Sequence, residues 1–204
     1  MLPAEVALRI FRISVDGDDG TAFTLDVNGR QYIVTAKHIA CSILGTTNID
    51  LWHDDNWISI EVELVGHSNV DVSVLTARQI LTNPQLVLEA SVGGFYFGQE
   101  AFFAGFPLDL MSPGVDSRFP IPLIKRAIIS GVAGSGYEAC YYLDALINPG
   151  FSGSPVYLKL PNSERYSVAM VVASYTAQRV PVLDEYDRET GSTILQNSGI
   201  TAAY

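Results

Sequence analysis

The stretch Asp144-Ala-Leu-Ile-Asn-Pro-Gly-Phe-Ser-Gly-Ser-Pro-Val156 decides how the rest of this 204-residue chain is interpreted. It holds Ser152 between Gly150 and Gly153, in a turn bounded by two prolines. Glycine adopts backbone dihedral angles that other residues avoid, and it leaves its own N–H uncovered. The N–H groups of Gly150 and Ser152 can therefore both donate to a developing oxyanion. The stretch predicts a serine nucleophile on a tight loop.

The segment Asn148 to Pro155 resembles the serine loop of trypsin-like (chymotrypsin-fold) serine peptidases. The longer run from Asp144 to Val156 is most similar to the HtrA/Deg-type bacterial branch, catalytic domain only. The resemblance implies an all-β, chymotrypsin-like double β-barrel with the active site between the barrels. It also implies a histidine and a carboxylate, because a serine hydroxyl alone is a poor nucleophile. The alternative is an ordinary turn between two strands, since Gly, Pro and Ser dominate turns for conformational reasons.

The histidine is expected at the end of a strand, in Tyr32-Ile-Val-Thr-Ala-Lys-His-Ile-Ala40. This segment resembles the strand and helical turn that carry the general base in the family, which makes His38 the candidate. His53 and His67 have no apolar strand leading into them and follow polar or glycine-containing connections. We expect both to be exposed or structurally satisfied.

Asp71 is the candidate for the carboxylate. Asp71-Val-Ser-Val-Leu75 matches the family's segment, in which an aspartate precedes a small or apolar run that ends in leucine. A carboxylate between valines is costly to bury without a cationic or N–H partner, and the imidazole of His38 would supply one. An aspartate that caps a turn at the start of a strand is the alternative. The order His38, Asp71, Ser152 is that of the chymotrypsin arrangement.

The composition indicates a globular protein with a well-filled core, because 48% of the residues are hydrophobic and 17% are charged. The 22 acidic and 12 basic residues give a formal net charge of −10. This charge repels phosphate backbones and anionic lipids, so the expected partner is a protein or peptide substrate, with no nucleic acid and no membrane. The oligomeric state is not predicted.

No stretch approaches the roughly 18 apolar residues of a membrane span. The residues after Met1 also lack the basic start and the apolar core of a secretory signal. We therefore expect a cytoplasmic protein, with a leader removed from the chain as the alternative.

Short strands separated by turn residues are expected throughout, which is typical of sandwiches and barrels. The strongest single signal is Asn28-Gly29, which favours a hairpin between two apolar runs. The expected strands are 6–15, 21–27, 30–35, 49–53, 57–65, 98–107, 121–131, 137–143, 156–160 and 166–175. Loops are expected at 108–120 and 184–191.

The boundary between the barrels is expected near residue 90, where turn residues punctuate the chain. An N-terminal barrel of residues 1–90 would then carry His38 and Asp71. A C-terminal barrel of residues 91–204 would carry Ser152, the oxyanion hole and the substrate pocket.

The substrate preference is expected to depend on the residues beside Ser152. Trypsin-like enzymes that require Arg or Lys have an aspartate six residues before the serine, and Leu146 stands there in this chain. An apolar residue cannot pair with a buried ammonium group, so we expect cleavage after small or medium apolar residues. The strands around Ser174-Tyr-Thr176 and Gly199 to Ala203 resemble the other pocket walls. The expected substrate-binding residues are Leu146, Ile147, Ser174, Tyr175, Thr176 and Thr201.

Phe151 is a departure from the digestive members of the family. Those enzymes have an aspartate immediately before the serine, which pairs with a newly cut N-terminus to assemble the oxyanion hole. Phe151 cannot form that ion pair. We therefore expect packing, and not N-terminal cleavage, to set the oxyanion hole at Gly150 and Ser152.

Together these residues predict a serine endopeptidase that hydrolyses peptide bonds through a His38, Asp71 and Ser152 triad. The N–H groups of Gly150 and Ser152 would form the oxyanion hole. No metal and no organic cofactor is implied. The alternative is a weakly active or inactive peptide-binding module on the same scaffold.

Overall fold

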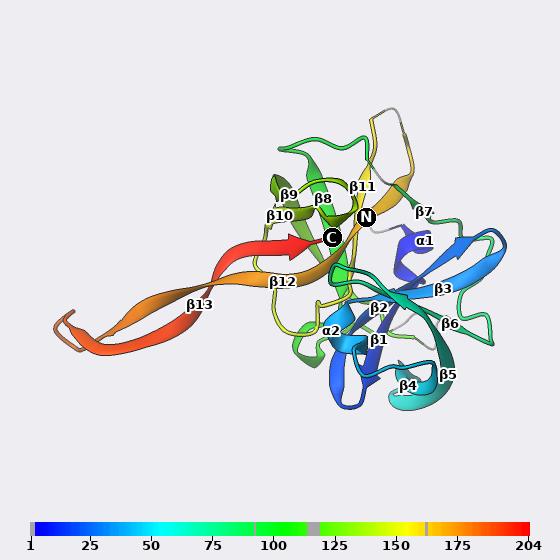
Figure 1. The fold of residues 1–204 in the computed structure, drawn as a ribbon, viewed down its shortest axis with the longest axis horizontal. Coiled ribbons are helices and arrows are strands. Elements are labelled where there is room, and N and C mark those ends of the chain that lie inside the picture. Colours follow the sequence, from blue (N-terminus) through cyan, green and yellow to red (C-terminus); the bar gives the residue numbers. More distant parts are fainter. Residues whose placement is uncertain (1–2, 92, 114–118, 162) are drawn as a thin grey trace.

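A computed structural model describes residues 3–91, 93–113, 119–161 and 163–204. The N-terminal part forms a closed barrel with the strand order β1-β2-β3-β6-β5-β4. Its strands are β1 (Ile10–Val15), β2 (Asp18–Val27), β3 (Arg30–Thr35), β4 (Thr46–His53), β5 (Asn56–His67) and β6 (Ser73–Ala77). A short helix, α1 (Ala4–Ala7), precedes β1, and another, α2 (Lys37–Ala40), follows β3 (Figure 1).

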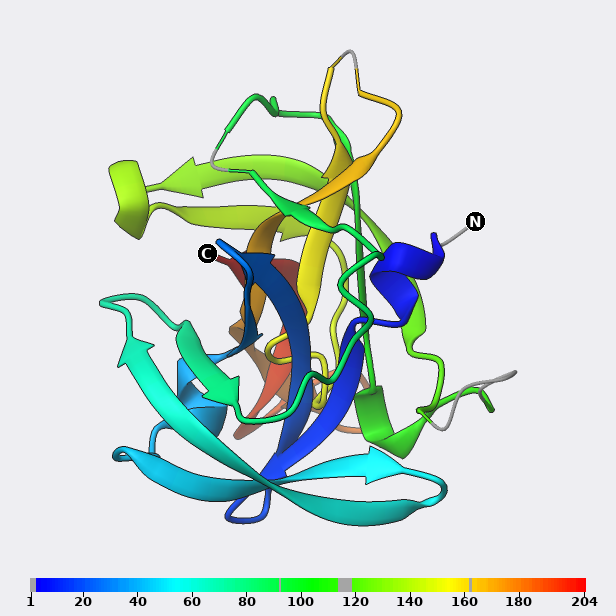
Figure 2. The same ribbon diagram turned by 90° about the vertical axis from the view of Figure 1, so that its right-hand side faces the viewer.

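The C-terminal part is a second sheet with the order β11-β8-β9-β10-β13-β12-β7. Because β11 also pairs with β12, its six longer strands close into a second barrel, which stacks beside the first (Figure 2). The strands are β7 (Glu89–Ala90), β8 (Glu100–Gly105), β9 (Leu123–Ala133), β10 (Cys140–Asp144), β11 (Pro155–Lys159), β12 (Tyr166–Leu183) and β13 (Glu189–Ala203). Two short 3₁₀ turns are η1 (Pro107–Asp109) and η2 (Gly136–Glu138). The expected all-β double-barrel architecture is confirmed.

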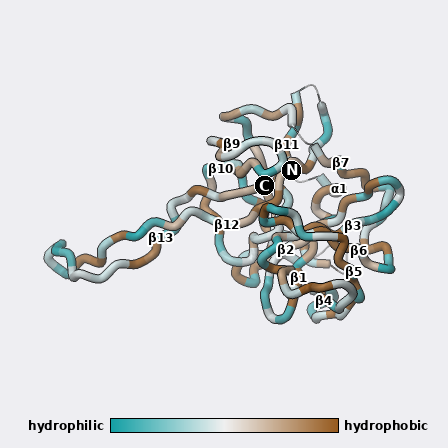
Figure 3. Tube along the Cα trace, in the orientation of Figure 1, coloured by the Kyte–Doolittle hydropathy of each residue, from teal (hydrophilic) through white to brown (hydrophobic). Residues whose placement is uncertain are grey.

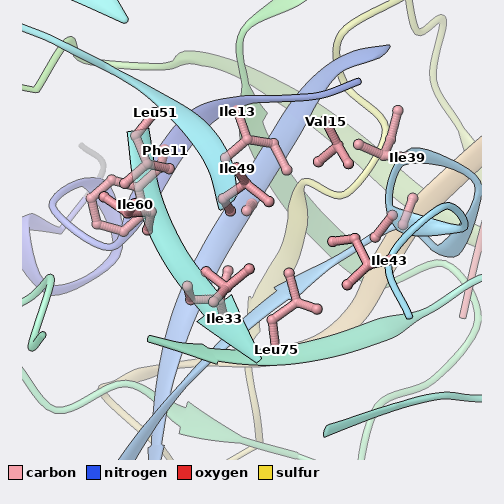
Figure 4. Close-up of a cluster of buried hydrophobic side chains, with 14 residues drawn as sticks. Phe11, Ile13, Val15, Ile33, Ile39, Ile43, Ile49, Leu51, Ile60 and Leu75 are labelled. Carbon is pink, nitrogen blue, oxygen red and sulfur yellow. The ribbon is translucent and has the colours of Figure 1, made fainter. Parts of the chain in front are cut away.

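Each barrel has its own hydrophobic core, and a third cluster joins the two barrels. Figure 4 shows the first core, where Phe11 and Ile13 of β1 meet Ile33, Leu51 and Leu75 of β3, β4 and β6. The second core contains Phe103, Leu143, Phe151, Val156 and Leu158. The joining cluster takes Ile10 and Phe23 from the first barrel and Phe106, Tyr157 and Val171 from the second part of the chain. Buried apolar side chains therefore fill the interface between the two barrels.

The hairpin at Asn28-Gly29 is confirmed. Both residues have positive φ, 52° and 77°, as a two-residue hairpin turn with the favoured twist requires, and Val27 pairs with Arg30.

Three other expectations need correction. The strand expected over residues 6–15 begins only at Ile10, because Val6 is fully buried in the cluster between the barrels as part of α1. The strand expected over 137–143 is preceded by η2 and begins at Cys140. The strand expected to end at Tyr175 continues to Leu183, and β13 returns from Glu189, so the loop expected over 184–191 is only the tip of a long hairpin (Figure 1).

Residues 114–118 of the expected loop 108–120 lie outside the described residues. Across the part of the chain that is described, no helix has the length and hydropathy needed to span a bilayer.

Thr21 of β2 links the two barrels through hydrogen bonds to the loop that carries Ser152. It is fully buried, its N–H donates to the carbonyl of Ser152 at 2.8 Å, and its Oγ1 donates to the carbonyl of Gly150 at 2.7 Å. The same Oγ1 accepts from the N–H of Phe106 at 3.2 Å. One side chain of the first barrel thus satisfies two backbone groups of the second.

Replacing Thr21 by Val keeps the shape of the side chain and removes its hydroxyl. The carbonyl of Gly150 and the N–H of Phe106 both lose a buried partner, so we expect the free energy of unfolding to fall by about 2 kcal/mol. Urea denaturation measures this change. Thr47→Val on β4, where the residue is exposed, is the matched control and should change it by less than about 0.5 kcal/mol. Equal stability of Thr21→Val and the parent would contradict the role of this contact.

Candidate active site

His38 and Asp71 form a doubly hydrogen-bonded pair. Nδ1 of His38 lies 2.7 Å from Oδ2 of Asp71, and the backbone N–H of His38 donates to Oδ1 at 2.9 Å. α2 presents the imidazole immediately after β3, and the bend before β6 presents the carboxylate. A proton on Nδ1, directed at Asp71, leaves the lone pair on Nε2 available to accept a proton.

The pair shifts the pKa values of both groups. The hydrogen bond that the His38 ring donates to Asp71, helped by the negative charges of Asp71 and Asp18, raises the pKa of His38 above its ordinary value of 6.5, although burial acts in the opposite direction. Burial alone would raise the pKa of Asp71. The hydrogen bonds from the His38 ring and from the N–H groups of His38 and Lys37 outweigh burial and lower it. Asp71 therefore stays ionised beside the imidazole at neutral pH.

Ser152 lies on a loop with a fixed backbone. The N–H of Phe151 donates to the carbonyl of Asn148 at 3.3 Å, with Pro149 and Gly150 between them. Proline followed by a glycine at φ +99° is the pattern of a type II turn. Phe151 is buried in the second core and packs edge-to-face on Phe103, with the ring centroids 5.1 Å apart. This packing supports the expectation that Phe151 replaces an ion pair as the anchor of the loop.

The backbone before Ser152 is oriented by a hydrogen bond to the carbonyl of Pro149. The carbonyl of Pro149 accepts from the N–H of Leu108 at 3.0 Å. In a trans peptide the C=O and the following N–H point in opposite directions, so this bond turns the N–H of Gly150 away from Leu108. Among the described residues, the N–H groups of Gly150 and Ser152 have no hydrogen-bond acceptor. Both N–H groups are therefore free to donate to a bound group.

The turn that supports Pro149 is itself strained and held from the first barrel. Leu108 and Asp109 have φ values of 50° and 60°, in the left-handed region that costs a non-glycine residue about 1–2 kcal/mol. The guanidinium of Arg12 bonds Asp109, and the Arg12 side chain is nearly buried. Arg12 is fixed in turn by Asp19 at 2.9 Å and by the Trp57 ring, whose centroid is 4.8 Å away. These contacts offset the backbone strain of the turn.

His38 and Ser152 line one cavity of about 340 Å³ between the barrels. In the cavity, Oγ of Ser152 donates to the carbonyl of Ala173 at 3.2 Å. The other lining residues are Ile147, Asn148, Pro149, Ala173, Ser174 and Tyr175. Three residues that are far apart in the sequence, His38, Asp71 and Ser152, are thus gathered in one region.

The residues expected to bind substrate fall in different places. Ile147, Ser174 and Tyr175 line the cavity, whereas half of the Leu146 surface is exposed. Thr201 is fully buried, and its Oγ1 donates to the carbonyl of Ala145 at 2.7 Å.

Thr176 lines a neighbouring cavity together with Tyr142 and Ile200. The substrate-binding roles of all six residues remain predictions. Sequence reasoning missed Asn148, Pro149 and Ala173 as lining residues. The position of Asn148 and Pro149 directly before the Gly-Phe-Ser motif was the signal that could have identified them.

The other two histidines make structural contacts. Nδ1 of His67 lies 2.6 Å from Oγ of Ser73, and the His53 ring packs on Phe119 with the centroids 4.7 Å apart. Neither lines the cavity that contains Ser152.

Several solved protease structures have the same fold as this chain. The HtrA-type protease AlgW with a tripeptide superposes with a TM-score of 0.62 at 17% identity, over 98% of this chain and 57% of that chain. The Rv3671c protease in its inactive form gives 0.59 at 16% identity, over 98% of this chain and 84% of the other. The MamO protease domain from Magnetospirillum magneticum, in its apo form, gives 0.55 at 12% identity, over 99% and 93%.

At these identities the likeness establishes the fold, which is that of trypsin-like, HtrA-type protease domains. This chain spans 57% of the length of the AlgW chain that it matches. No protein-family model matches the sequence, and no curated protein sequence matches it either.

Two glycines with similar dihedral angles test how tightly the serine loop is packed. Gly153 has φ +86°, and a Cβ built on it would lie 1.9 Å from the carbonyl oxygen of Thr21. Gly29 has φ +77° and faces open space. We expect Gly153→Ala to lower the free energy of unfolding by about 3 kcal/mol or more, because strain and overpacking add.

Gly29→Ala should cost only the backbone strain, about 1–2 kcal/mol. Guanidinium denaturation of the two variants gives the comparison. Similar losses for both would show that the loop moves away from Thr21 at little cost.

Proposed function

We propose that this protein is a serine endopeptidase that hydrolyses peptide bonds through His38, Asp71 and Ser152. One observation carries the proposal: an imidazole held by a carboxylate through two hydrogen bonds opens into the same cavity as a serine hydroxyl on a glycine-bounded loop. The N–H groups of Gly150 and Ser152, which have no acceptor among the described residues, support the oxyanion hole that acyl transfer requires. The trypsin-like protease fold of the chain supports the same class of reaction.

In the proposed mechanism, Oγ of Ser152 attacks the carbonyl carbon of the scissile peptide bond. The hydroxyl proton passes to Nε2 of His38, and Asp71 stabilises the imidazolium that forms. The N–H groups of Gly150 and Ser152 donate to the oxygen that becomes negative. His38 then protonates the leaving amine. Water attacks the acyl-enzyme in a second cycle of the same proton transfer and releases the product acid.

One feature of the cavity favours the alternative of a weakly active or inactive peptide-binding module. The hydroxyl of Ser152 donates to the carbonyl of Ala173 and not to His38. Catalytic hydrogen bonds are often long or misaligned before substrate binds, and rotation about χ1 moves a serine oxygen between staggered positions. Chemical reactivity of the hydroxyl separates the two functions.

We expect a fluorophosphonate probe to label the parent protein and to leave Ser152→Ala unlabelled, with peptide turnover lowered by about 10⁴-fold or more in that variant. Ser154→Ala is the matched control. Ser154 is fully buried in the same loop, and its Oγ lacks a hydrogen-bond partner among the described residues. This control should label at the parent rate.

The labelling rate should rise with pH through a midpoint above 6.5, because the neutral form of His38 is the base and its pKa is raised. A parent protein that stays unlabelled at every pH would refute the proposed enzyme and favour the binding module.

The proposed substrates carry small or medium apolar residues before the scissile bond. Leu146 stands where enzymes specific for Arg or Lys have an aspartate. The next residue, Ile147, is buried and lines the cavity that contains Ser152. A peptide library varied at this position should show the highest kcat/KM for Ala, Val and similar residues.

A preference for Arg or Lys in the same library would contradict the assignment. A preference for Asp or Glu would contradict it as well, and would point to Lys125, whose Nζ donates to the carbonyl of Leu146.

A further inference from the structure

Beyond the second barrel, β12 and β13 form a two-stranded arm of residues 174–199 that projects away from the body of the protein (Figure 1). Within the arm the two strands pair from Ala177 with Asn197 out to Leu183 with Glu189. Apolar segments alternate with polar ones along the arm, and the tip is hydrophilic (Figure 3). An isolated two-stranded ribbon is marginally stable in water, so a partner would stabilise this one.

The first residues of the arm belong to the cavity that contains Ser152. Within the barrel, β11 pairs with β12 as far as Pro155 with Val171, and Gly153 and Ser154 continue the contact at Val172. The carbonyl of Ala173 then faces Ser152, and Ser174 and Tyr175 line the cavity. From Ser174 outward, no described strand pairs with β12 on the side opposite β13. This open edge therefore begins at the proposed nucleophile and continues along the arm without a break.

The edge of the arm that β13 forms does not reach the cavity that contains Ser152. β10 pairs with β13 over Ile200 to Ala203, so the open edge of β13 begins beside Ile200. Ile200 lines a separate cavity with Tyr142 and Thr176. Of the two edges of the arm, the one formed by β12 is continuous with the cavity of His38 and Ser152.

We propose that the open edge of β12 from Tyr175 to Val180 is an extended substrate-binding site, on which the substrate segment N-terminal to the scissile bond adds as an antiparallel strand. This inference rests on the proposed endopeptidase function. β12 runs away from Ser152 along the arm, so a chain antiparallel to it runs toward Ser152. Such a chain places its C-terminal end at the nucleophile. The residues that lie along the arm are thus those before the scissile bond.

Pro181 sets the length of the site. Proline has no N–H to donate, and at a sheet edge it interrupts pairing with an added strand. Tyr175 to Val180 is a run of six residues without proline or glycine, which spans about 20 Å in extended form. With the residues that enter the cavity itself, the substrate would be held over about eight residues before the scissile bond. The acidic residues Asp184, Glu185, Asp187 and Glu189 lie beyond Pro181 and outside the site.

Recognition along this edge comes mainly from main-chain hydrogen bonds. Side chains from Tyr175 to Arg179 are exposed. Added strands receive their affinity from the backbone ladder, and side chains on alternate positions adjust the selectivity. The site therefore favours extended, unstructured segments over folded ones, with little dependence on sequence far from the scissile bond.

The test uses fluorescein-labelled peptides with identical residues around the scissile bond and from about two to about twelve residues before it. Anisotropy measures their binding to the Ser152→Ala protein, and kcat/KM is measured for the parent. We expect affinity to increase at least about tenfold as the peptide is extended to about eight residues, and to stay constant beyond that length.

Two arm variants in the Ser152→Ala background provide matched controls. The short-arm variant replaces residues 179–195 by Asn-Gly between the paired Gln178 and Gln196. The tip variant replaces residues 184–188 by Asn-Gly between the paired Leu183 and Glu189. The short-arm variant keeps the edge only from Tyr175 to Gln178, so its affinity should stop rising at a peptide length of about six residues, whereas the tip variant should behave as the parent does. Both should bind the shortest peptide as the parent does.

Binding to the Ser152→Ala protein requires no catalysis, so the two proposals fail in different ways. If the parent hydrolyses no peptide, the endopeptidase proposal is wrong. The anisotropy measurements on the Ser152→Ala protein would still show whether the arm binds peptides. Affinity that is independent of peptide length, or a length dependence that is unchanged in the short-arm variant, would overturn the inference. If the short-arm variant instead changes a dimer into a monomer in ultracentrifugation while the length dependence persists, the edge belongs to a second copy of the chain.

Discussion

The structure depends on the close backbone contact between Thr21 of the first barrel and the serine loop of the second. The carbonyl oxygen of Thr21 occupies the space that a side chain at Gly153 would need, and Oγ1 of Thr35 donates to that same oxygen at 2.8 Å. Thr35 ends β3 immediately before α2, which carries His38. Thr21 thus contacts both the segment that holds the proposed base and the loop that holds the proposed nucleophile. Relative movement of the barrels at this point would break several buried hydrogen bonds, each of which is costly to lose.

Packing and a strained turn hold the backbone around Ser152. Phe151 inserts into the second core, and the turn of Leu108 and Asp109 holds the carbonyl of Pro149. That turn is strained and is held by Arg12, which Trp57 and Asp19 position. The backbone around Gly150 and Ser152 is therefore held by packing in the second barrel and by contacts from the first.

The sequence predicted those features that depend on local residue chemistry. Asn28-Gly29 has a conformational requirement that defines the hairpin, and the residues around Ser152 resemble a known loop, so the two-barrel architecture followed. Features that depend on tertiary contacts were missed. A threonine in a strand carries no signal of the role that Thr21 plays, and Val6 is helical because of packing between the barrels. The arm was missed because residues 176–179 are exposed and show no alternation of apolar and polar residues.

The central claim is that the Ser152 hydroxyl, the His38 imidazole and two backbone N–H groups converge on one reacting carbonyl. A crystal structure of the protein with a peptide boronic acid, which mimics the tetrahedral intermediate, tests it most directly. The account predicts a bond from boron to Oγ of Ser152, with one boron oxygen accepting from the N–H groups of Gly150 and Ser152 and Nε2 of His38 facing the adduct. A boronate that does not bond Ser152, or an adduct whose oxygen is out of reach of both N–H groups, would contradict the account.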